Sequence, residues 1–341
     1  MPNIAIIGAT GAVGDVFLRV AEERNFPVGD LKLLATARSA GKTLKFKNKN
    51  IIVEEVSKAS LADSDIVFCS ATSEASKEWG PLVREMGSVM IDDGSAVRLD
   101  RTVPLVVPEV NAADLSWHEG IISIPNCTTT PLALALHSMR SISEPIKVTA
   151  STYQAVTGSG TAAVLELTGQ LEALTQEKVI PQPTVYPQQI AMNVLPQVDE
   201  FDEGNYTKEE LKMRNETRKI LHLPDLPITA TCVRVPTMIG HAETIHVEFQ
   251  ESVDLQEIFS TLSRQEGISI SESPHEYPTP LTAEGNDLTH IGRLRRDETV
   301  EDNKGIVFWC VSDNLRKGAA TNALQIAEEL LKRNLLRGNN A

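Results

Sequence analysis

A cysteine among polar residues precedes an apolar run in residues 123–136, SIPNCTTTPLALAL. The run from Pro131 onward predicts a helix, and the three threonines before it are candidate N-caps. Cys127 is therefore expected at a helix N-terminus, where the helix dipole and free N–H groups lower the pKa of a thiol. A thiolate at this position suits nucleophilic chemistry.

The other three cysteines, Cys69, Cys232 and Cys310, lie in apolar, strand-like runs and are expected in the core as inert thiols. All four cysteines are widely spaced and no CxxC pair occurs, which disfavours a zinc site and a disulfide framework. We therefore expect no metal, and reduced thiols that suit a cytoplasmic protein.

A glycine-rich turn, GATGAVG, follows the first apolar run and opens a helix-like stretch. Glycine lets the chain turn tightly and bring backbone N–H groups to a pyrophosphate at a helix N-terminus. Because the spacing is GxxGxxG rather than GxGxxG, a turn that binds no ligand is the alternative. The predicted cofactor contacts here are Gly8, Thr10, Gly11, Ala12, Val13 and Gly14.

The segment after the second predicted strand, ATARSAGK, lacks the acidic residue that accepts a ribose 2′-hydroxyl in NAD sites. It offers Thr36, Arg38 and Ser39 instead, and a cation with hydroxyl groups suits a 2′-phosphate. We predict NADP as the cofactor; the alternative interpretation is a solvated basic loop. A low-pKa thiolate beside a nicotinamide then predicts aldehyde chemistry through a thioester.

The elements that position these residues follow two patterns. Over about the first 125 residues, β-rich runs alternate with helical stretches, which predicts a parallel sheet covered by helices. The expected strands are residues 3–7, 31–35, 51–55, 66–70, 88–92 and 105–107, with a helix over residues 13–24.

From about Lys147 the pattern predicts one mixed or antiparallel sheet. Its expected strands are residues 148–156, 228–235, 241–249 and 306–311, with helices over residues 158–174, 207–221 and 320–335. In the second of these helices, Thr207 and Glu210 fit a capping box, and Glu209, Lys212 and Glu216 form a polar face. The Pro-containing residues 179–201 are expected to be irregular.

Composition limits the function classes. A chain of 341 residues accommodates two domains, and 41% hydrophobic with 23% charged residues is typical of a soluble globular protein. The net charge of −14 argues against nucleic acid as a partner. No apolar run is long enough to span a membrane, and the first residues lack the basic region of a signal peptide.

Several motifs together resemble the aspartate-β-semialdehyde dehydrogenase family of the bacterial type. These are GATGAVG, IPNCTTTPL, STYQAVTGSG, TKEELKM, RVPTMIGH and SDNLRKGAA, which follow the family's order over essentially the whole chain. The resemblance implies that Cys127 is the nucleophile, that His241 is the acid/base group, and that Gln154 orients the acyl intermediate. Without the motif, a lone histidine such as His241 would be assigned to the core or the surface.

The resemblance also implies the binding residues. Arg234 would hold the substrate α-carboxylate, Glu209 its ammonium group, and Arg98, Asn126 and Lys212 its phosphate group. For Arg98 the alternative is a solvated loop arginine, and for Glu209 and Lys212 it is a surface i,i+3 pair. Gly158 and Asn314 would lie near the nicotinamide.

The implied fold is α/β: a Rossmann-type parallel sheet completed by the C-terminal helix, plus a central α+β catalytic and dimerisation domain with a mixed sheet. The expected NADP-binding domain comprises residues 1–126 and 315–341, and the catalytic domain residues 127–314. The expected assembly is a homodimer or a dimer of dimers, with the stretch around residues 179–196 at the contact.

The implied reaction is the NADP-dependent interconversion of β-aspartyl phosphate and L-aspartate 4-semialdehyde through a cysteine thioester. In this family the step serves lysine (through diaminopimelate), methionine, threonine and isoleucine biosynthesis. One alternative is an N-acetyl-glutamyl-phosphate reductase-like enzyme, and the other is a catalytically silent paralogue that retains the fold.

Overall fold

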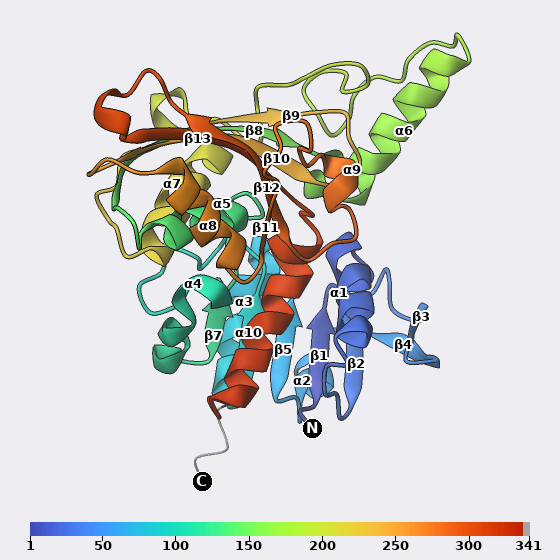
Figure 1. Ribbon diagram of the computed structural model, residues 1–341. Helices are drawn as coiled ribbons and strands as arrows, with labels where there is room; N and C mark the ends of the chain where they lie inside the picture. The colour runs from blue at the N-terminus through green and yellow to red at the C-terminus, as the bar shows by residue number, and fades with distance from the viewer. Residues whose placement is uncertain (337–341) are drawn as a thin grey trace. The chain divides into compact units, whose positions relative to one another are not determined.

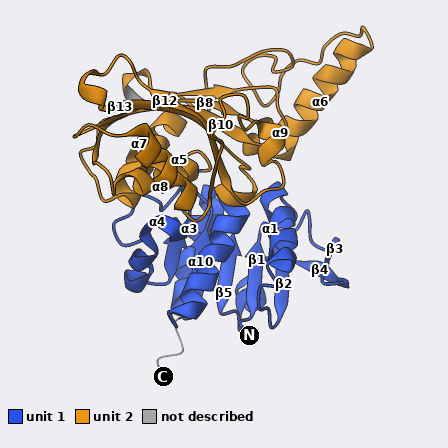
Figure 2. Ribbon diagram, viewed as in Figure 1, with its two compact units in different colours: residues 1–126, 319–341 blue, residues 127–318 orange. Residues whose placement is uncertain are grey.

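The structure is a computed structural model that describes residues 1–336 in two compact units (Figure 2). Unit 1 comprises residues 1–126 and the described part of residues 319–341, and unit 2 comprises residues 127–318. Residues 337–341, which the predicted NADP-binding domain includes, lie outside the described residues.

Unit 1 is built on one sheet with the strand order β3-β4-β2-β1-β5-β6-β7 (Figure 1). Neighbouring strands pair in parallel, except that β3 runs antiparallel to β4. β1 and β5 are buried at every position, which requires cover on both faces of the sheet. The strands are β1 Ile4–Ile7, β2 Leu31–Ala35, β3 Thr43–Phe46, β4 Lys49–Glu55, β5 Ile66–Cys69, β6 Val89–Asp92 and β7 Ile121–Ser123.

The C-terminal helix completes unit 1, as predicted. Asn322 of α10 donates a hydrogen bond to the carbonyl oxygen of Val106 over 2.8 Å, and Arg24, at the end of α1, pairs with Glu328 over 2.6 Å. The helices of unit 1 are α1 Ala12–Glu23, α2 Lys58–Leu61, α3 Ser73–Glu85, α4 Pro108–Asn111 and α10 Thr321–Lys332.

Unit 2 contains the predicted mixed sheet, with the strand order β11-β12-β13-β10-β8-β9. β8 and β9 pair in parallel, as do β11 and β12, while the pairs within β12-β13-β10-β8 are antiparallel. The strands are β8 Pro145–Gln154, β9 Ile228–Arg234, β10 His241–Phe249, β11 Ile268–Ile270, β12 Thr289–Arg296 and β13 Gly305–Ser312.

The two faces of this sheet differ. On one face, Cys232 of β9 contacts Met213 of α7, and Gln154 of β8 reaches Glu209 of the same helix. On the other face, Tyr153 stays 39% exposed beside Trp309. The functional side chains described below face the helices. The helices of unit 2 are α5 Thr129–Met139, α6 Thr161–Thr175, α7 Lys208–Ile220, α8 Leu255–Arg264 and α9 Pro280–Ala283.

Two local predictions were wrong. Residues 105–107 make only a single bridge, from Leu105 to Ser123, because Pro104 and Pro108 flank the segment and Pro108 starts α4. The polar face of α7 is largely buried, since Glu209 and Glu216 are 6% and 1% exposed. The predicted capping box of Thr207 and Glu210 is confirmed.

In the part of the chain that the structure describes, no helix is long and apolar enough to cross a membrane.

Candidate active site

Four side chains lie in a row across neighbouring strands of unit 2. Gln154 on β8 is registered with Arg234 on β9 and with His241 on β10. His241 is in turn registered with Ser312 on β13. Residues directly opposite each other share one face of a sheet, so the register brings three predicted site residues together. None of the four side chains is more than 4% exposed.

A backbone amide fixes the tautomer of the neutral His241 ring. The N–H of Ala155 donates to Nδ1 of His241 over 3.0 Å, so in the neutral ring the proton lies on Nε2. Burial, reinforced by the charge of Arg234 and opposed by the Gly240 carbonyl, lowers the pKa of His241 to about 3. Its buried Nε2 has no hydrogen-bond partner within the described residues. His241 therefore presents an N–H donor to the site.

Arg234 is fixed by its neighbours before any ligand binds. Its Nη1 donates to the carbonyl oxygen of Ala155 over 2.7 Å, and its guanidinium lies 5.9 Å from the centre of the Tyr186 ring. Leu195 exchanges two backbone hydrogen bonds with Arg234. Part of the Pro-containing stretch that was predicted as a contact surface thus holds Arg234 in place.

Gln154 and Glu209 connect the sheet to α7. Nε2 of Gln154 donates to Oε1 of Glu209 over 3.0 Å, while Nζ of Lys212 lies 3.4 Å from the other carboxylate oxygen. Lys212 also pairs with Asp199 over 2.7 Å. The alternative of a surface i,i+3 pair is wrong for Glu209, because that side chain is buried against the row.

The capping box positions α7 beside the row. Glu210 accepts a hydrogen bond from the N–H of Thr207 over 2.7 Å and another from the N–H of Cys232 over 3.0 Å. One buried carboxylate therefore starts the helix and ties it to β9.

Cys127 directly precedes the N-cap of α5 and is half-buried. Thr128 occupies the N-cap position but makes no side-chain capping hydrogen bond, so the predicted capping by a threonine at this position was wrong. The helical backbone of Thr128 accounts for this, because an N-cap side chain reaches the next N–H groups from an extended backbone. A β-carbon on Gly318 would lie 2.8 Å from the β-carbon of Cys127, so the glycine permits this close approach.

Burial separates the remaining cysteines from Cys127. Cys69, Cys232 and Cys310 are buried, and desolvation raises the pKa of each thiol, that of Cys69 to about 12. Cys127 is the more accessible thiol.

Two predicted nicotinamide contacts lie together beside His241. Oδ1 of Asn314 accepts a hydrogen bond from the N–H of Gly240 over 2.9 Å, and Asn314 also bonds the hydroxyl of Thr157. A β-carbon on the adjacent Gly158 would lie 3.0 Å from Nε2 of His241 and 3.0 Å from Nη1 of Arg234. A side chain at position 158 would crowd His241 and Arg234, so glycine at this position keeps both side chains accessible.

In unit 1, the glycine turn has the required geometry. Gly8 has φ +85°, and a β-carbon there would lie 2.0 Å from the carbonyl oxygen of Ser70. A β-carbon on Gly14 would lie 2.6 Å from the carbonyl oxygens of Gly8 and Ala9. Gly11 is the N-cap of α1 and offers no capping side chain, so Thr10, Ala12 and Val13 belong to an uncapped helix start.

The segment after β2 forms a turn. The N–H of Ser39 donates to the carbonyl oxygen of Thr36 over 2.8 Å, and Ser39 is 8% exposed. Thr36 and Arg38 are exposed, and the Arg38 side chain has no partner among the described residues.

Arg98 and Asn126 also belong to unit 1 and are buried. Nη2 of Arg98 donates to the carbonyl oxygen of Asp93 over 2.7 Å, so the alternative of a solvated loop arginine was wrong. The structure thus fixes Arg98 beside the end of β6.

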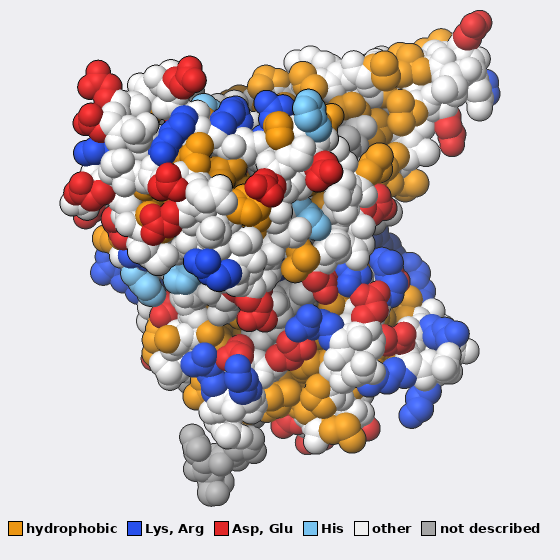
Figure 3. Space-filling model, in the orientation of Figure 1, with side chains coloured by type: hydrophobic (Ala, Val, Ile, Leu, Met, Phe, Trp, Pro, Cys, Tyr) orange, Lys and Arg blue, Asp and Glu red, His pale blue; other side chains and the backbone are white. Residues whose placement is uncertain are grey.

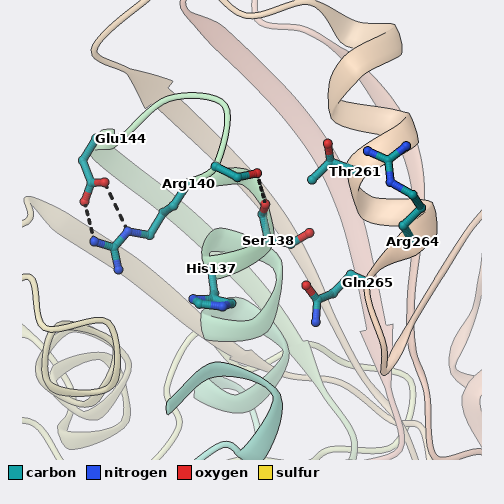
Figure 4. A pocket seen from close by; sticks show the side chains of 8 residues that line it. His137, Ser138, Arg140, Glu144, Thr261, Arg264 and Gln265 are labelled. Carbon is teal, nitrogen blue, oxygen red and sulfur yellow. Dashed lines mark hydrogen bonds and ion pairs between the residues drawn. The ribbon is translucent and has the colours of Figure 1, made fainter. Parts of the chain in front are cut away.

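A cavity of about 560 Å³ lies elsewhere in unit 2 and contains none of the predicted site residues (Figure 4). On one side of the cavity, Arg140 forms an ion pair with Glu144, and Arg264 lies on the other side. Both arginines stand at helix C-termini, where basic side chains offset the negative end of the dipole. This explains the basic lining without a ligand. Among residues 1–336, no three His, Cys, Asp or Glu side chains are grouped as metal ligands.

Two family profiles match the chain. Residues 3–118 match "Semialdehyde dehydrogenase, NAD binding domain", and residues 136–317 match "Semialdehyde dehydrogenase, dimerisation domain". Aspartate-semialdehyde dehydrogenase of Aquifex aeolicus is 46% identical over 98% of this chain and 99% of its own length. The enzyme of that name from Bacillus subtilis is 42% identical over 98% and 99%. The chain belongs to the aspartate-semialdehyde dehydrogenase family.

Solved structures agree with this membership. The crystal structure of aspartate semialdehyde dehydrogenase II from Vibrio cholerae complexed with ASA has a TM-score of 0.95 and 41% identity, covering 97% of this chain and 98% of that one. A probable aspartate-semialdehyde dehydrogenase from Pseudomonas aeruginosa has a TM-score of 0.91 at 30% identity, covering 98% and 100%. The resemblance predicted from the motifs is confirmed, and with it the fold, an oxidoreductase function and a nicotinamide-binding domain.

Membership of the aspartate-semialdehyde dehydrogenase family leaves one buried residue beside the row unexplained. Glu243 of β10 is fully buried two residues after His241 and on the same face of the sheet. Glu243 lies outside the motifs quoted above. The signal was present in HAETIHVEF, where an acidic residue occupies an inward position of a strand whose other inward positions after His241 are apolar.

Proposed function

We propose that the chain is an NADP-dependent, phosphorylating aspartate-semialdehyde dehydrogenase that works through a thioester on Cys127. The observation that carries this proposal is the row of Arg234, Gln154 and His241 on one face of the unit 2 sheet. Glu209 contacts that row, and Cys127 directly precedes the N-cap of α5. The site combines an accessible thiol, an N–H donor, and charges suited to an amino acid.

In the biosynthetic direction, the Cys127 thiolate attacks the acyl carbon of β-aspartyl phosphate, the C–O bond to phosphate breaks, and inorganic phosphate leaves. A nicotinamide cofactor, when bound, supplies the hydride that the thioester carbon accepts. The Nε2–H of His241 donates a hydrogen bond to the carbonyl oxygen as it gains negative charge, and the oxyanion of the resulting hemithioacetal re-forms the carbonyl while the C–S bond breaks, which releases the semialdehyde and the Cys127 thiolate. In the reverse direction, the same N–H stabilises the oxyanion that forms when the thiolate adds to the aldehyde.

Gln154 orients the acyl group during these steps. One N–H of its amide is bonded to Glu209, and the second N–H is the one we assign to the acyl oxygen. A donor aimed at that oxygen stabilises the charge that develops there.

Substrate recognition is assigned to charged groups. Arg234, whose buried Nε has no partner within the described residues, binds the α-carboxylate. Glu209 binds the ammonium group, and Lys212, Arg98 and Asn126 bind the phosphate group. The 41% identical Vibrio cholerae relative crystallised with ASA supports this substrate class.

The glycine turn fits a dinucleotide pyrophosphate. β-carbons at Gly8 and Gly14 would collide with backbone oxygens, and α1 starts without a capping side chain, so its N-terminus is suited to an anion. Gly158 and Asn314 fit the nicotinamide end of the cofactor.

NADP rather than NAD is proposed because Arg38 is exposed and unpaired among the described residues, beside Thr36 and Ser39. Arg38→Ala is expected to raise the Kd of NADP about tenfold while leaving that of NAD unchanged, because only NADP carries the 2′-phosphate. Cofactor titration measures both constants. Equal losses for the two cofactors would remove Arg38 from 2′-phosphate recognition.

The profile matches support the following assignment of parts, which we propose. Residues 1–126 with residues 315–341 bind NADP, and residues 127–314 supply catalysis and the contact of a homodimer or a dimer of dimers. We place this step in the cytoplasm and in lysine, methionine, threonine and isoleucine biosynthesis.

Phosphate-dependent NADP reduction tests the function with two substrates, aspartate semialdehyde and N-acetylglutamate semialdehyde. The first is expected to be used at least about a hundredfold better, because Glu209 pairs with a free ammonium that the second lacks. A preference for the second would favour the reductase alternative. Cys127→Ala is expected to abolish turnover while NADP still binds, and residual turnover near wild type would refute the nucleophile. No turnover by wild type with NADP bound would identify a silent paralogue.

A further inference from the structure

Glu243 lies on β10 two residues after His241, directly beside the row of Gln154, Arg234, His241 and Ser312. It is registered with Thr152 on β8 and with Cys310 on β13, whereas His241 is registered with Gln154. Glu243 is 0% exposed, and neither carboxyl oxygen has a hydrogen-bond donor among the described residues. A buried carboxyl without a partner is costly, so its presence in place of an apolar side chain requires a reason.

Gln154 has a buried acceptor atom that lacks a hydrogen-bond donor in the part of the chain that the structure describes. Its Nε2 donates to Glu209, but its Oε1 is buried and receives no hydrogen bond from the described residues. Gln154 and Glu243 are diagonal neighbours on adjacent strands and share one face, a separation that long side chains can bridge. An acceptor without a donor thus lies beside a carboxyl that can supply one.

Burial keeps the proton on Glu243. Desolvation raises the pKa of Glu243 well above its usual value, and the neighbouring Glu209 carboxylate raises it further. The thiols of Cys232 and Cys310 also interact with Glu243, and the neutral His241 lies two residues before it on the same face. None of these groups brings a positive charge. Desolvation and the Glu209 carboxylate both favour the carboxylic acid form of Glu243, which has one O–H to donate.

We propose that Glu243 is a positioning residue that donates its carboxyl hydrogen to Oε1 of Gln154 and so fixes the direction in which the Gln154 amide faces. With Oε1 held, both N–H groups of the amide point away from Glu243: one to Glu209 and one to the acyl oxygen. A flipped amide would place Oε1 against the Glu209 carboxylate. The consequence for catalysis rests on the role of Gln154 in the proposed function.

Two substitutions of similar length separate positioning from space-filling. Glu243→Gln keeps a donor and Glu243→Met removes it. Glu243→Met is expected to lower kcat about tenfold or more, while Glu243→Gln keeps it within about threefold of wild type, because misplacing a group that orients substrate is costly. Glu248→Gln, the same change on the same strand away from the row, is the matched control and is expected to be unchanged. Equal kcat in the Met and Gln variants would overturn the proposal.

A second readout does not depend on turnover. Thermal unfolding of Glu243→Met, Gln154→Leu and the double variant forms a cycle in which a direct bond makes the two losses in Tm less than additive. Additive losses would overturn the bond. If Gln154→Leu kept full turnover, the assigned role of Gln154 in the proposed function would fail, and the cycle would still decide whether the bond exists.

Discussion

At the scale of single residues, the chemistry depends on which atoms are already engaged. The sequence motifs predicted His241 as an acid/base group, but they could not indicate its tautomer, because the deciding partner is the backbone N–H of Ala155. That N–H belongs to a residue with no functional side chain and is brought there by the pairing of β8 with β10. Side-chain patterns do not record such a contact.

His241 is expected to remain neutral, with its proton on Nε2, from about pH 5 to about pH 9. Its pKa of about 3 lies below the ordinary value of 6.5, so the ring gains a proton only well below this range. Nitrogen NMR of labelled histidine distinguishes the two ring nitrogens and checks both statements. The exposed His275 provides the internal comparison. A ring that titrates near neutrality, or an Nδ1–H signal, would contradict the assignment.

Arg234→Lys is expected to lower kcat/KM for aspartate semialdehyde about ten- to a hundredfold. A lysine has one ammonium group, which cannot keep the bond to Ala155 and also bind a carboxylate with a planar fork. Steady-state kinetics measures the loss. Arg295→Lys, an exposed residue of the same sheet, is the matched control and is expected to be unchanged. A wild-type kcat/KM in Arg234→Lys would contradict carboxylate binding by this residue.

At the scale of elements, local signals predicted the helices and strands that carry the site. β2 and β10 have the predicted bounds, and the capping box correctly placed the start of α7. The acidic side chains of the predicted polar face on α7 are buried, because a charge pattern does not reveal which elements pack over it. The prediction of a strand over residues 105–107 was wrong for a local reason, because prolines flank the segment on both sides.

Glu210→Ala is expected to destabilise the folded state by about 2–3 kcal/mol, because two buried backbone N–H groups lose their acceptor. It is also expected to raise KM, since α7 carries Glu209 and Lys212. Urea unfolding and steady-state kinetics measure the two effects. Asp254→Ala, which removes the N-cap of α8, is the matched control: about 1 kcal/mol of stability is lost and KM stays unchanged. An unaltered KM in Glu210→Ala would show that α7 needs no such anchor.

At the scale of the whole molecule, the site residues come from segments distant in sequence. Strand register in unit 2 aligns positions 154, 234, 241 and 312, a relation that no local pattern contains. Several family motifs in order made the grouping predictable, because STYQAVTGSG contains Gln154 and RVPTMIGH contains both Arg234 and His241. Glu243 escaped prediction because its significance depends on orphaned neighbours, which only the assembled sheet reveals.

Assembly is the last property at this scale. Apolar side chains are exposed on α6 and the segment that follows it: Leu165, Val179, Met192 and Val194 are 58–94% exposed, and Figure 3 shows hydrophobic side chains gathered along α6. Exposed apolar side chains grouped in this way indicate a surface that binds another protein chain. This stretch lies in the part of the chain that matches the dimerisation domain profile. Met192→Asp with Val194→Asp is expected to convert the proposed homodimer to monomers in light scattering. Ile52→Asp, an equally exposed site in unit 1, is expected to leave the dimer intact. A dimer that survives the double substitution would place the contact elsewhere, with the open face of the unit 2 sheet around Tyr153 and Trp309 next to be tested.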